Sequence, residues 1–179
     1  MEQAPLLSNS QRINFENLSK QLADPNVVFV VKAKLPGFTM PTGTTRTLLY
    51  YLCDQRMFGT IYWLTTTETQ VKLLVGDFEE LLLRFGDKRQ LIKKSPRHVT
   101  LREEDGSEYS IKFISGGLKF MRGLSAIDAL IIIDRTEPAM NDPFWLPYIA
   151  NNTRFVCKWG VPEEEMHEEM LKVTRFIRL

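Results

Sequence analysis

Cysteine and histidine are scarce in this chain of 179 residues, which contains two of each: Cys53, Cys157, His98 and His167. The cysteines lie far apart and outside any CxxC pattern, which argues against a disulfide framework and against a zinc site built from cysteines. A reducing compartment fits this cysteine usage better. Two histidines are too few for a histidine-rich metal centre.

The chain also lacks an excess of charge and a long apolar run. It has 23 basic and 22 acidic residues, so bulk charge does not hold nucleic acid, although a local basic patch still can. No apolar run approaches the roughly 20 residues that span a bilayer, and residues 1–11 do not resemble a secretory signal. With 44% hydrophobic and 25% charged residues, the composition is that of one soluble folded domain covering 1–179, with no membrane partner.

Buried strands and amphipathic helices alternate along the whole chain. The elements predicted before residue 86 are a leading helix within 1–26, a strand at 27–32, a loop at 33–43, a helix from 44 or 45 to about 57, a strand at 60–65 and a helix with an apolar stripe from 71 to 85. The later ones are a polar connector at 87–98, a hairpin at 99–114 around Asp105-Gly106, strands at 129–133 and 153–158, and a final helix within 161–179. The order predicts an α/β fold with a mostly parallel sheet.

Ligands of such sheets bind beyond the carboxyl ends of the strands, which draws attention to the loops at 32–45 and 134–138. The first loop lies between a buried strand and a helix and contains Gly43, Thr44, Thr45 and Arg46. Glycine lets backbone amides approach a phosphate, and a helix N-terminus adds donors. A phosphate loop also needs lysine after the glycine, where this chain has Thr44, and the glycine spacing is one residue longer than usual. Turn geometry alone is the alternative explanation of this loop.

The second loop follows a hydrophobic strand that ends in a carboxylate, Asp134. In P-loop ATPases such an aspartate holds magnesium, and the next residue is a glutamate that polarises the attacking water. Here the next residue is Arg135, and Glu137 comes three residues after Asp134. The alternative role for Asp134 is that of a strand-end carboxylate which caps the following turn.

Four segments together resemble the ATPase domain of the large terminases, the motors that package DNA into tailed-phage and herpesvirus-type capsids. They are Gly-Ser at 106–107, IKFISGG at 111–117, MRGLSA at 121–126 and DALIIID at 128–134. The resemblance extends over about 27–160, which would form the core of a single terminase-like domain. It implies a P-loop NTPase-like fold of the RecA/ASCE type with a β-hairpin insertion. It also implies ATP and Mg²⁺ as ligands and DNA, capsid or portal proteins and other terminase subunits as partners, in the cytoplasm or nucleus of an infected cell.

Carried over residue by residue, the resemblance assigns a set of site residues. Catalytic roles fall to Asp134 and Glu137, and magnesium binding to Thr45 and Asp134. Nucleotide-binding roles fall to Gly43, Thr44, Thr45, Arg46, Arg122 and Arg135. Arg122 has a salt bridge to Asp128 as its alternative role.

The chain differs from the family at two positions whose side chains act directly in catalysis. Thr44 replaces the loop lysine, and Arg135 replaces the glutamate after Asp134. Loss of one such electrostatic group costs about 3 kcal/mol of transition-state stabilisation. The coupling segment after the last strand is not evident at 158–160, and 179 residues leave no room for the family's nuclease domain. We therefore expect an impaired ATPase, or one part of a larger motor, in viral DNA packaging.

Two other functions remain open on the sequence alone. One is a non-catalytic interaction module on an α/β scaffold that binds a capsid or motor partner without nucleotide. The other is a working NTPase in which Arg46 and Glu137 act as displaced substitutes. The basic connector at 87–98 is either a nucleic-acid contact or a solvated loop.

Overall fold

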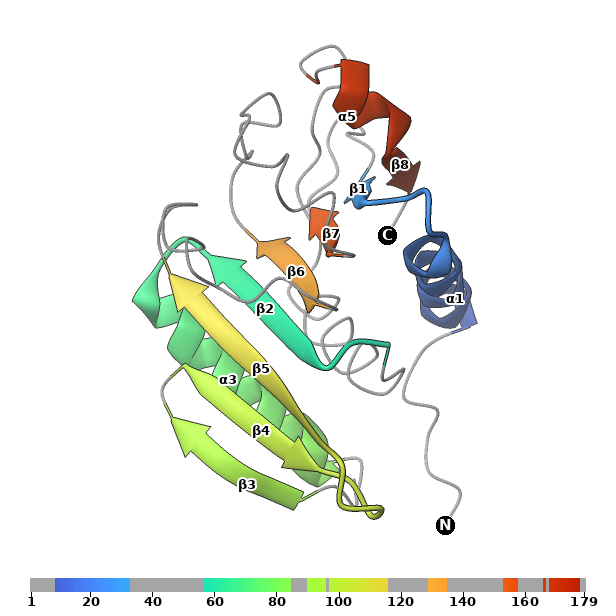
Figure 1. Cartoon of the computed structure of the whole chain (residues 1–179). Helices are drawn as coiled ribbons and strands as arrows, with labels where there is room; N and C mark the ends of the chain where they lie inside the picture. The colour runs from blue at the N-terminus through green and yellow to red at the C-terminus, as the bar shows by residue number, and fades with distance from the viewer. Residues whose placement is uncertain are drawn as a thin grey trace.

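A computed structural model describes residues 9–32, 57–84, 90–95, 97–115, 129–134, 153–157, 166 and 168–177 of the chain. Eight strands in these residues form one sheet in the order β3-β4-β5-β2-β6-β7-β1-β8 (Figure 1). The strands are β1 (Phe29–Lys32), β2 (Thr60–Thr65), β3 (Gln90–Ser95), β4 (His98–Arg102), β5 (Glu108–Ser115), β6 (Ala129–Asp134), β7 (Arg154–Cys157) and β8 (Thr174–Ile177). The helices are α1 (Asn9–Ala23), α3 (Glu68–Arg84) and α5 (Glu168–Lys172).

The sheet is parallel except at one edge. Neighbouring strands from β5 to β8 all pair in parallel, whereas β3, β4 and β5 pair antiparallel. The four strands predicted at 27–32, 60–65, 129–133 and 153–158 lie in this one sheet, which confirms the predicted α/β fold with a mostly parallel sheet. Strand β7 lies between β1 and β6, so the two candidate loops leave strands that are separated by a single strand.

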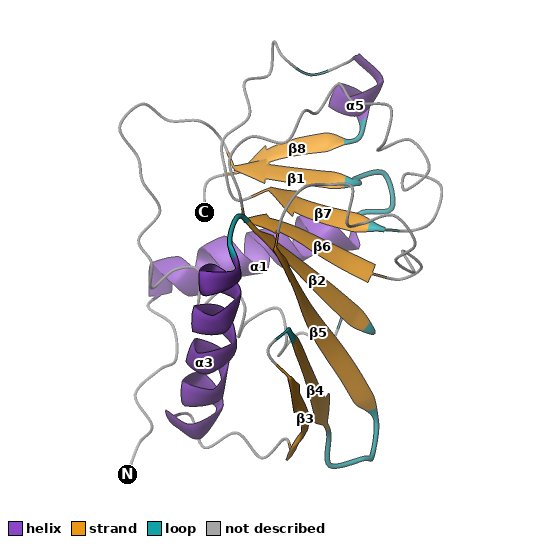
Figure 2. Ribbon diagram, turned by 90° about the vertical axis from the view of Figure 1, so that its left-hand side faces the viewer, coloured by secondary structure: helices purple, strands orange, loops and turns teal. Residues whose placement is uncertain are grey.

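Each face of the sheet has its own hydrophobic cluster, because alternate residues of a strand point to opposite faces. On one face Trp63, Ile132 and Val156 pack with the buried residues of α1 and α3. Both helices lie on that side of the sheet (Figure 2). The other face holds Ile133 and Cys157, and Met170 of α5 packs against it. Burial raises the pKa of the Cys157 thiol to about 12, so it remains a protonated core residue.

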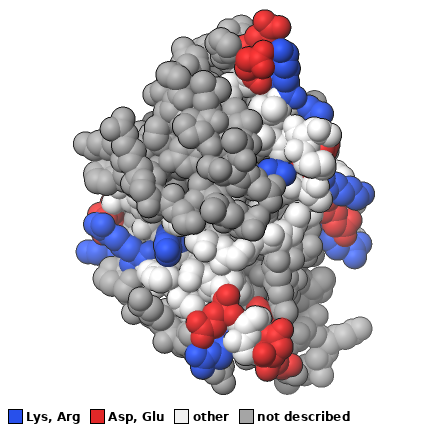
Figure 3. Space-filling view, viewed as in Figure 1, with Lys and Arg blue, Asp and Glu red and all other residues white. Residues whose placement is uncertain are grey.

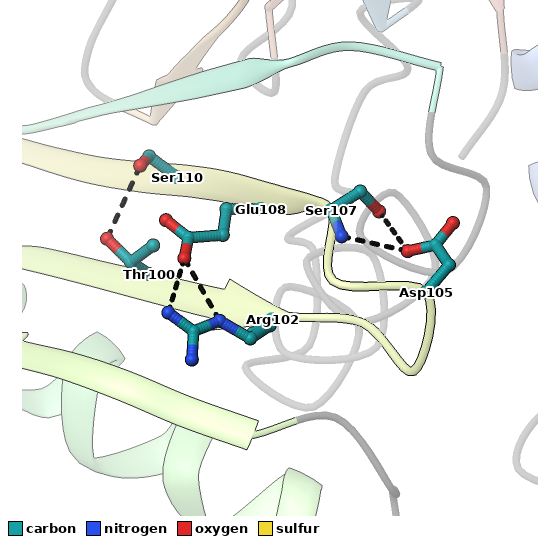
Figure 4. Close-up of polar contacts among 6 residues, drawn as sticks. All are labelled: Thr100, Arg102, Asp105, Ser107, Glu108 and Ser110. Carbon is teal, nitrogen blue, oxygen red and sulfur yellow. Dashed lines mark hydrogen bonds and ion pairs between the residues drawn. The ribbon is translucent and has the colours of Figure 1, made fainter.

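The predicted hairpin is formed by β4 and β5 and extends the sheet beyond β2. Its turn has Gly106 at a φ of 84°, a conformation that favours glycine, and Asp105 accepts hydrogen bonds from the Ser107 amide and hydroxyl (Figure 4). Arg102 and Glu108, which are register partners, form an ion pair at 2.7 Å. The Asp-Gly signal in the sequence therefore located this hairpin correctly.

The predicted terminal helix within 161–179 is wrong for its last part. Helix α5 ends at Lys172, and the next residues form β8, which pairs in parallel with β1. The Thr174 hydroxyl donates to the Met170 carbonyl at 2.6 Å, and the Val28 amide donates to the Val173 carbonyl at 2.8 Å. Arg175, which lies within the predicted helix, is paired in register with Val30 of β1. Pairing with β1, which lies far away in the sequence, outweighs the local helical pattern.

The polar connector predicted at 87–98 is also not a loop throughout. Residues Gln90–Ser95 form β3, an edge strand antiparallel to β4 with a register irregularity between Leu91 and Lys93. Without it, the outer backbone groups of β4 would have no partner strand. Lysine-rich, irregular strands are typical of sheet edges, where they discourage pairing with other chains.

Candidate functional site

The site predicted at the carboxyl edge of the parallel strands depends on how their ends are aligned. Asp134, the last residue of β6, is the register partner of Thr65 at the end of β2. On the other side of β6, Cys157 pairs with both Ile133 and Val31. Lys32, the last residue of β1, therefore lies level with Asp134 and two strand spacings away, about 10 Å between Cα atoms. The predicted phosphate loop therefore begins, in the sequence, at a residue that lies level with Asp134.

The Asp134 carboxylate is held by a hydrogen bond from a buried tryptophan. Trp63 Nε1 donates to Asp134 Oδ2 at 3.1 Å, and the Trp63 side chain is fully buried. Asp134 is partly exposed and has the strand parity of Leu130 and Ile132, which face α1 and α3. Met57 and Phe58, at the end of the helix predicted from 44 or 45, pack against the same cluster. The Asp134 carboxylate and the two residues Met57 and Phe58, which precede β2, thus lie on the same face of the sheet.

Of the predicted site residues, Asp134 is the one that the structure describes. The others lie outside the described residues, and their roles stay predictions: Gly43, Thr44, Thr45, Arg46, Arg122, Arg135 and Glu137. No group of three or more His, Cys, Asp or Glu side chains that could hold a metal ion occurs in the described part of the chain.

A second polar cluster, which no sequence motif indicates, lies at the same edge of the sheet and is centred on Glu68. The Arg97 Nε donates to Glu68 Oε1 at 2.8 Å, and the Ser115 hydroxyl donates to Glu68 Oε2 at 2.6 Å. The hydrogen bond from Arg97, followed by that from Ser115, holds the pKa of Glu68 below its ordinary value. Because β5 and β6 flank β2 on opposite sides, this carboxylate is held away from Asp134. Glu68 joins α3 to β5 and to the turn between β3 and β4.

The turn from β2 into α3 is fixed by a capping box. The Gln70 amide donates to the Thr67 hydroxyl at 3.3 Å, and the Thr67 amide donates to Gln70 Oε1 at 3.2 Å. The buried Thr65 hydroxyl donates to the Thr67 carbonyl at 2.9 Å. The capping box thus fixes the backbone that follows Thr65, the register partner of Asp134.

The basic connector at 87–98, interpreted from the sequence as either a nucleic-acid contact or a solvated loop, is described in part by the structure. Arg97 is paired with Glu68, and its side chain is 63% exposed. Lys112 of β5 lies over the Tyr62 ring, 5.6 Å from the centroid. On the face shown in Figure 3, basic and acidic side chains of the described residues gather in small mixed groups. Both interpretations, a nucleic-acid contact and a solvated loop, remain open.

Comparison with known proteins finds similarity in structure alone. No family model matches the sequence, and no curated protein matches it significantly. The large terminase of a thermophilic bacteriophage matches 84% of this chain with a TM-score of 0.57 and 11% identity. The chain has a terminase-like fold. The large-terminase resemblance drawn from residues 106–134 is thereby confirmed at the level of fold.

Further solved terminase structures are similar to a lesser degree. A complex of the same thermophilic phage's large terminase with ADP has a TM-score of 0.48, at 11% identity over 85% of this chain and 38% of that one. The large terminase ATPase domain of Thermus phage P74-26 also has a TM-score of 0.48, at 11% identity over 87% of this chain and 65% of that one. The terminase-like chain spans about 38% of the length of the thermophilic phage protein. None of the described helices is long and apolar enough to cross a membrane.

Proposed function

We propose that this terminase-like domain binds a nucleotide with Mg²⁺ at the carboxyl edge of its sheet and serves in viral DNA packaging with impaired turnover. The observation that carries the proposal is the alignment of Asp134 with the end of β1, one intervening strand away, in a terminase-like fold. This alignment brings a carboxylate to the level at which the candidate phosphate loop begins. Catalytic impairment and the site roles rest on the sequence.

In this proposal each predicted residue has a definite task. Backbone amides at Gly43 and Thr44 bind phosphate oxygens at the start of a helix, and Arg46 adds positive charge. The hydroxyl of Thr45 and the carboxylate of Asp134 hold Mg²⁺, which neutralises charge on the phosphates. The guanidinium groups at Arg122 and Arg135 bind further phosphate oxygens, for which bidentate arginine geometry is well suited.

Turnover is slow in this proposal because two groups that act on the transition state are replaced. Thr44 brings no cation to the transferring phosphates, and Arg135 cannot orient water as a carboxylate does. Each loss costs about 3 kcal/mol, which corresponds to roughly a hundredfold in rate. Glu137 is the remaining nearby carboxylate in the sequence and is displaced by two positions from the usual place. In this proposal the chain therefore still binds nucleotide, although it hydrolyses it slowly or not at all.

The proposed setting is a packaging motor inside an infected cell, with DNA, capsid or portal proteins and other terminase subunits as partners. Sequence-independent contact with DNA would act through phosphate charge and so would weaken with salt.

A second candidate function is an interaction module that binds a motor or capsid partner without nucleotide. The observation in its favour is that both described carboxylates at this edge have structural partners. Asp134 accepts a hydrogen bond from Trp63, and Glu68 accepts hydrogen bonds from Arg97 and Ser115. In this alternative both carboxylates would hold the edge of the sheet together, and nucleotide would have no effect on the protein.

Nucleotide binding separates the two candidates. We expect a non-hydrolysable ATP analogue to bind the wild-type chain in calorimetric titration, with higher affinity in Mg²⁺ than in EDTA. Asp134→Asn keeps an acceptor for the Trp63 indole but removes the charge, and should abolish the gain due to Mg²⁺. Glu104→Gln, at an exposed acid in the hairpin turn on the opposite edge, is the matched control and should bind as wild type does. Absence of nucleotide binding by the folded wild type favours the interaction module.

A further inference from the structure

We infer that Trp63 is a positioning residue of the Asp134 carboxylate, holding Oδ2 through its indole N–H in the orientation in which the carboxylate binds the metal. The inference rests on the proposed nucleotide function and assigns to it a residue that the sequence motifs do not include. The direct observation is the hydrogen bond from Trp63 Nε1 to Asp134 Oδ2 at 3.1 Å, between residues 71 positions apart.

The indole is a rigid support because of its place in the sheet. Trp63 lies on the central strand β2, with Phe113 of β5 and Ile132 of β6 as its register partners. All three side chains are essentially inaccessible to solvent and belong to the cluster covered by α1 and α3. A large side chain in such a cluster is held in one rotamer by close packing. The direction of its N–H is therefore fixed.

The indole N–H and the carboxylate depend on each other. An indole nitrogen can donate but cannot accept, and a buried donor without an acceptor costs about 1–3 kcal/mol. A carboxylate has two oxygens with about four acceptor sites, of which the indole takes one. The hydrogen bond thus restricts the orientation of the Asp134 carboxylate. Hydrogen bonds of this kind to metal ligands typically change metal affinity by about 10–100-fold.

The hydroxyl of Thr65, on the neighbouring strand β2, does not hold the Asp134 carboxylate in the way that the indole does. Thr65 is the register partner of Asp134, but its hydroxyl donates to the Thr67 carbonyl at 2.9 Å. This donation belongs to the turn that leads into α3. The Trp63 indole, in contrast, donates directly to the Asp134 carboxylate.

The indole N–H is itself a spectroscopic probe of this contact. With tryptophan labelled by ¹⁵N, the chain should give indole signals from Trp63, Trp145 and Trp159, and the variants Trp145→Phe and Trp159→Phe assign the Trp63 signal by elimination. We expect the Trp63 signal to move when Mg²⁺ is added to the chain saturated with a non-hydrolysable ATP analogue. In Asp134→Asn the same addition should leave it unmoved.

Calorimetry of Trp63→Phe completes the test. The gain in nucleotide affinity on adding Mg²⁺ should fall by about 10–100-fold, while affinity in EDTA stays at the wild-type value. Phe113→Leu is the control for a disturbed core, because it alters the same cluster without touching the indole N–H, and should keep the Mg²⁺-dependent gain. If Trp63→Phe does not fold, the indole signal of the wild type and of Asp134→Asn decides alone.

The outcomes separate this inference from the proposed function. If nucleotide binds with a gain from Mg²⁺ but the Trp63 signal does not respond, Trp63 does not position the metal ligand and the proposed function still holds. An unchanged Mg²⁺-dependent gain in folded Trp63→Phe has the same meaning. If the folded wild type binds no nucleotide in either condition, the proposed function fails, and the positioning role fails with it.

Discussion

The Ser115 hydroxyl donates to the Glu68 carboxylate at 2.6 Å, joining the end of β5 to the first residue of α3 across 47 positions of sequence. Arg97, from the turn between β3 and β4, approaches the other carboxylate oxygen at 2.8 Å. Glu68 therefore links three elements on the side of β2 that faces away from β6. It stabilises the antiparallel extension of the sheet and leaves Asp134 as the described carboxylate next to the candidate loop.

The charge of Glu68 should make stability depend on pH. Its pKa is lowered in the folded chain, first by the hydrogen bond from Arg97 and then by that from Ser115. A lowered folded pKa gives stability that is present above the unfolded value of about 4.3 and is lost as pH falls through the folded pKa. Glu68→Gln should therefore unfold at lower urea than wild type at pH 7 and at the same urea at low pH. A stability difference that is equal at both pH values contradicts this assignment.

The capping box at the start of α3 should contribute measurably to stability. Thr67→Ala removes the hydroxyl that accepts from the Gln70 amide, and should lower the free energy of unfolding by about 1 kcal/mol. Thr69→Ala, at an exposed position in the same first turn, is the control and should have a smaller effect. Urea titrations of the three proteins measure the difference. Equal effects of the two substitutions would mean that Thr67 is not the cap.

The apolar strand β6 should be a principal source of stability. Ile132 is fully buried between the neighbouring strands, so Ile132→Ala should cost about 2–5 kcal/mol of unfolding free energy. Ile13 on α1 is 53% exposed, and Ile13→Ala should cost under about 1 kcal/mol. Urea unfolding compares the same chemical change at the two positions. A cost for Ile132→Ala as small as that for Ile13→Ala would be incompatible with the described core.

The sequence predicted those elements whose signals are local. The apolar run that ends at Asp134 and the Asp105-Gly106 turn each specify an element without reference to distant residues. Strands β3 and β8 were missed because their stability comes from pairing with β4 and β1, and their own composition is polar or helix-like. Periodicity does not reveal such non-local pairing.

The candidate site was predictable to a similar extent. The rule for parallel sheets placed Asp134 at the correct edge, and register then aligned it with the end of β1. The hydrogen bond from Trp63 could not be foreseen, because a tryptophan in a buried strand has the same pattern whether or not its N–H meets a carboxylate. The partners of Glu68 were hidden for the same reason, since neither lies near it in sequence.

Hydrolysis should be absent or far slower than the roughly 1–100 s⁻¹ of many phosphoryl-transfer enzymes. The reason is the replacement of the loop lysine by Thr44 and of the following glutamate by Arg135. Release of inorganic phosphate from ATP with Mg²⁺ measures it, with Asp134→Ala as the reference for contaminating activity. Turnover in the usual range that Asp134→Ala abolishes would rule out the impaired site and favour Arg46 and Glu137 as working substitutes.

In the function proposed above, the loop after β1 and the end of β6 form one nucleotide site in which two catalytic groups have been replaced. Thr44→Lys would return a cation to the phosphates, and Arg135→Glu would remove a positive charge from the neighbourhood of the metal. Both substitutions act on one bound Mg²⁺–nucleotide unit, so their effects should not be additive.

The decisive measurement is a calorimetric titration of wild type, both single variants and the double variant with a non-hydrolysable ATP analogue and Mg²⁺. We expect the double variant to bind more tightly than wild type, by a larger free-energy change than the sum of the two single variants. If the double variant keeps the wild-type melting temperature and binds no better, the loop after β1 is not a phosphate-binding loop and the proposed nucleotide site is wrong.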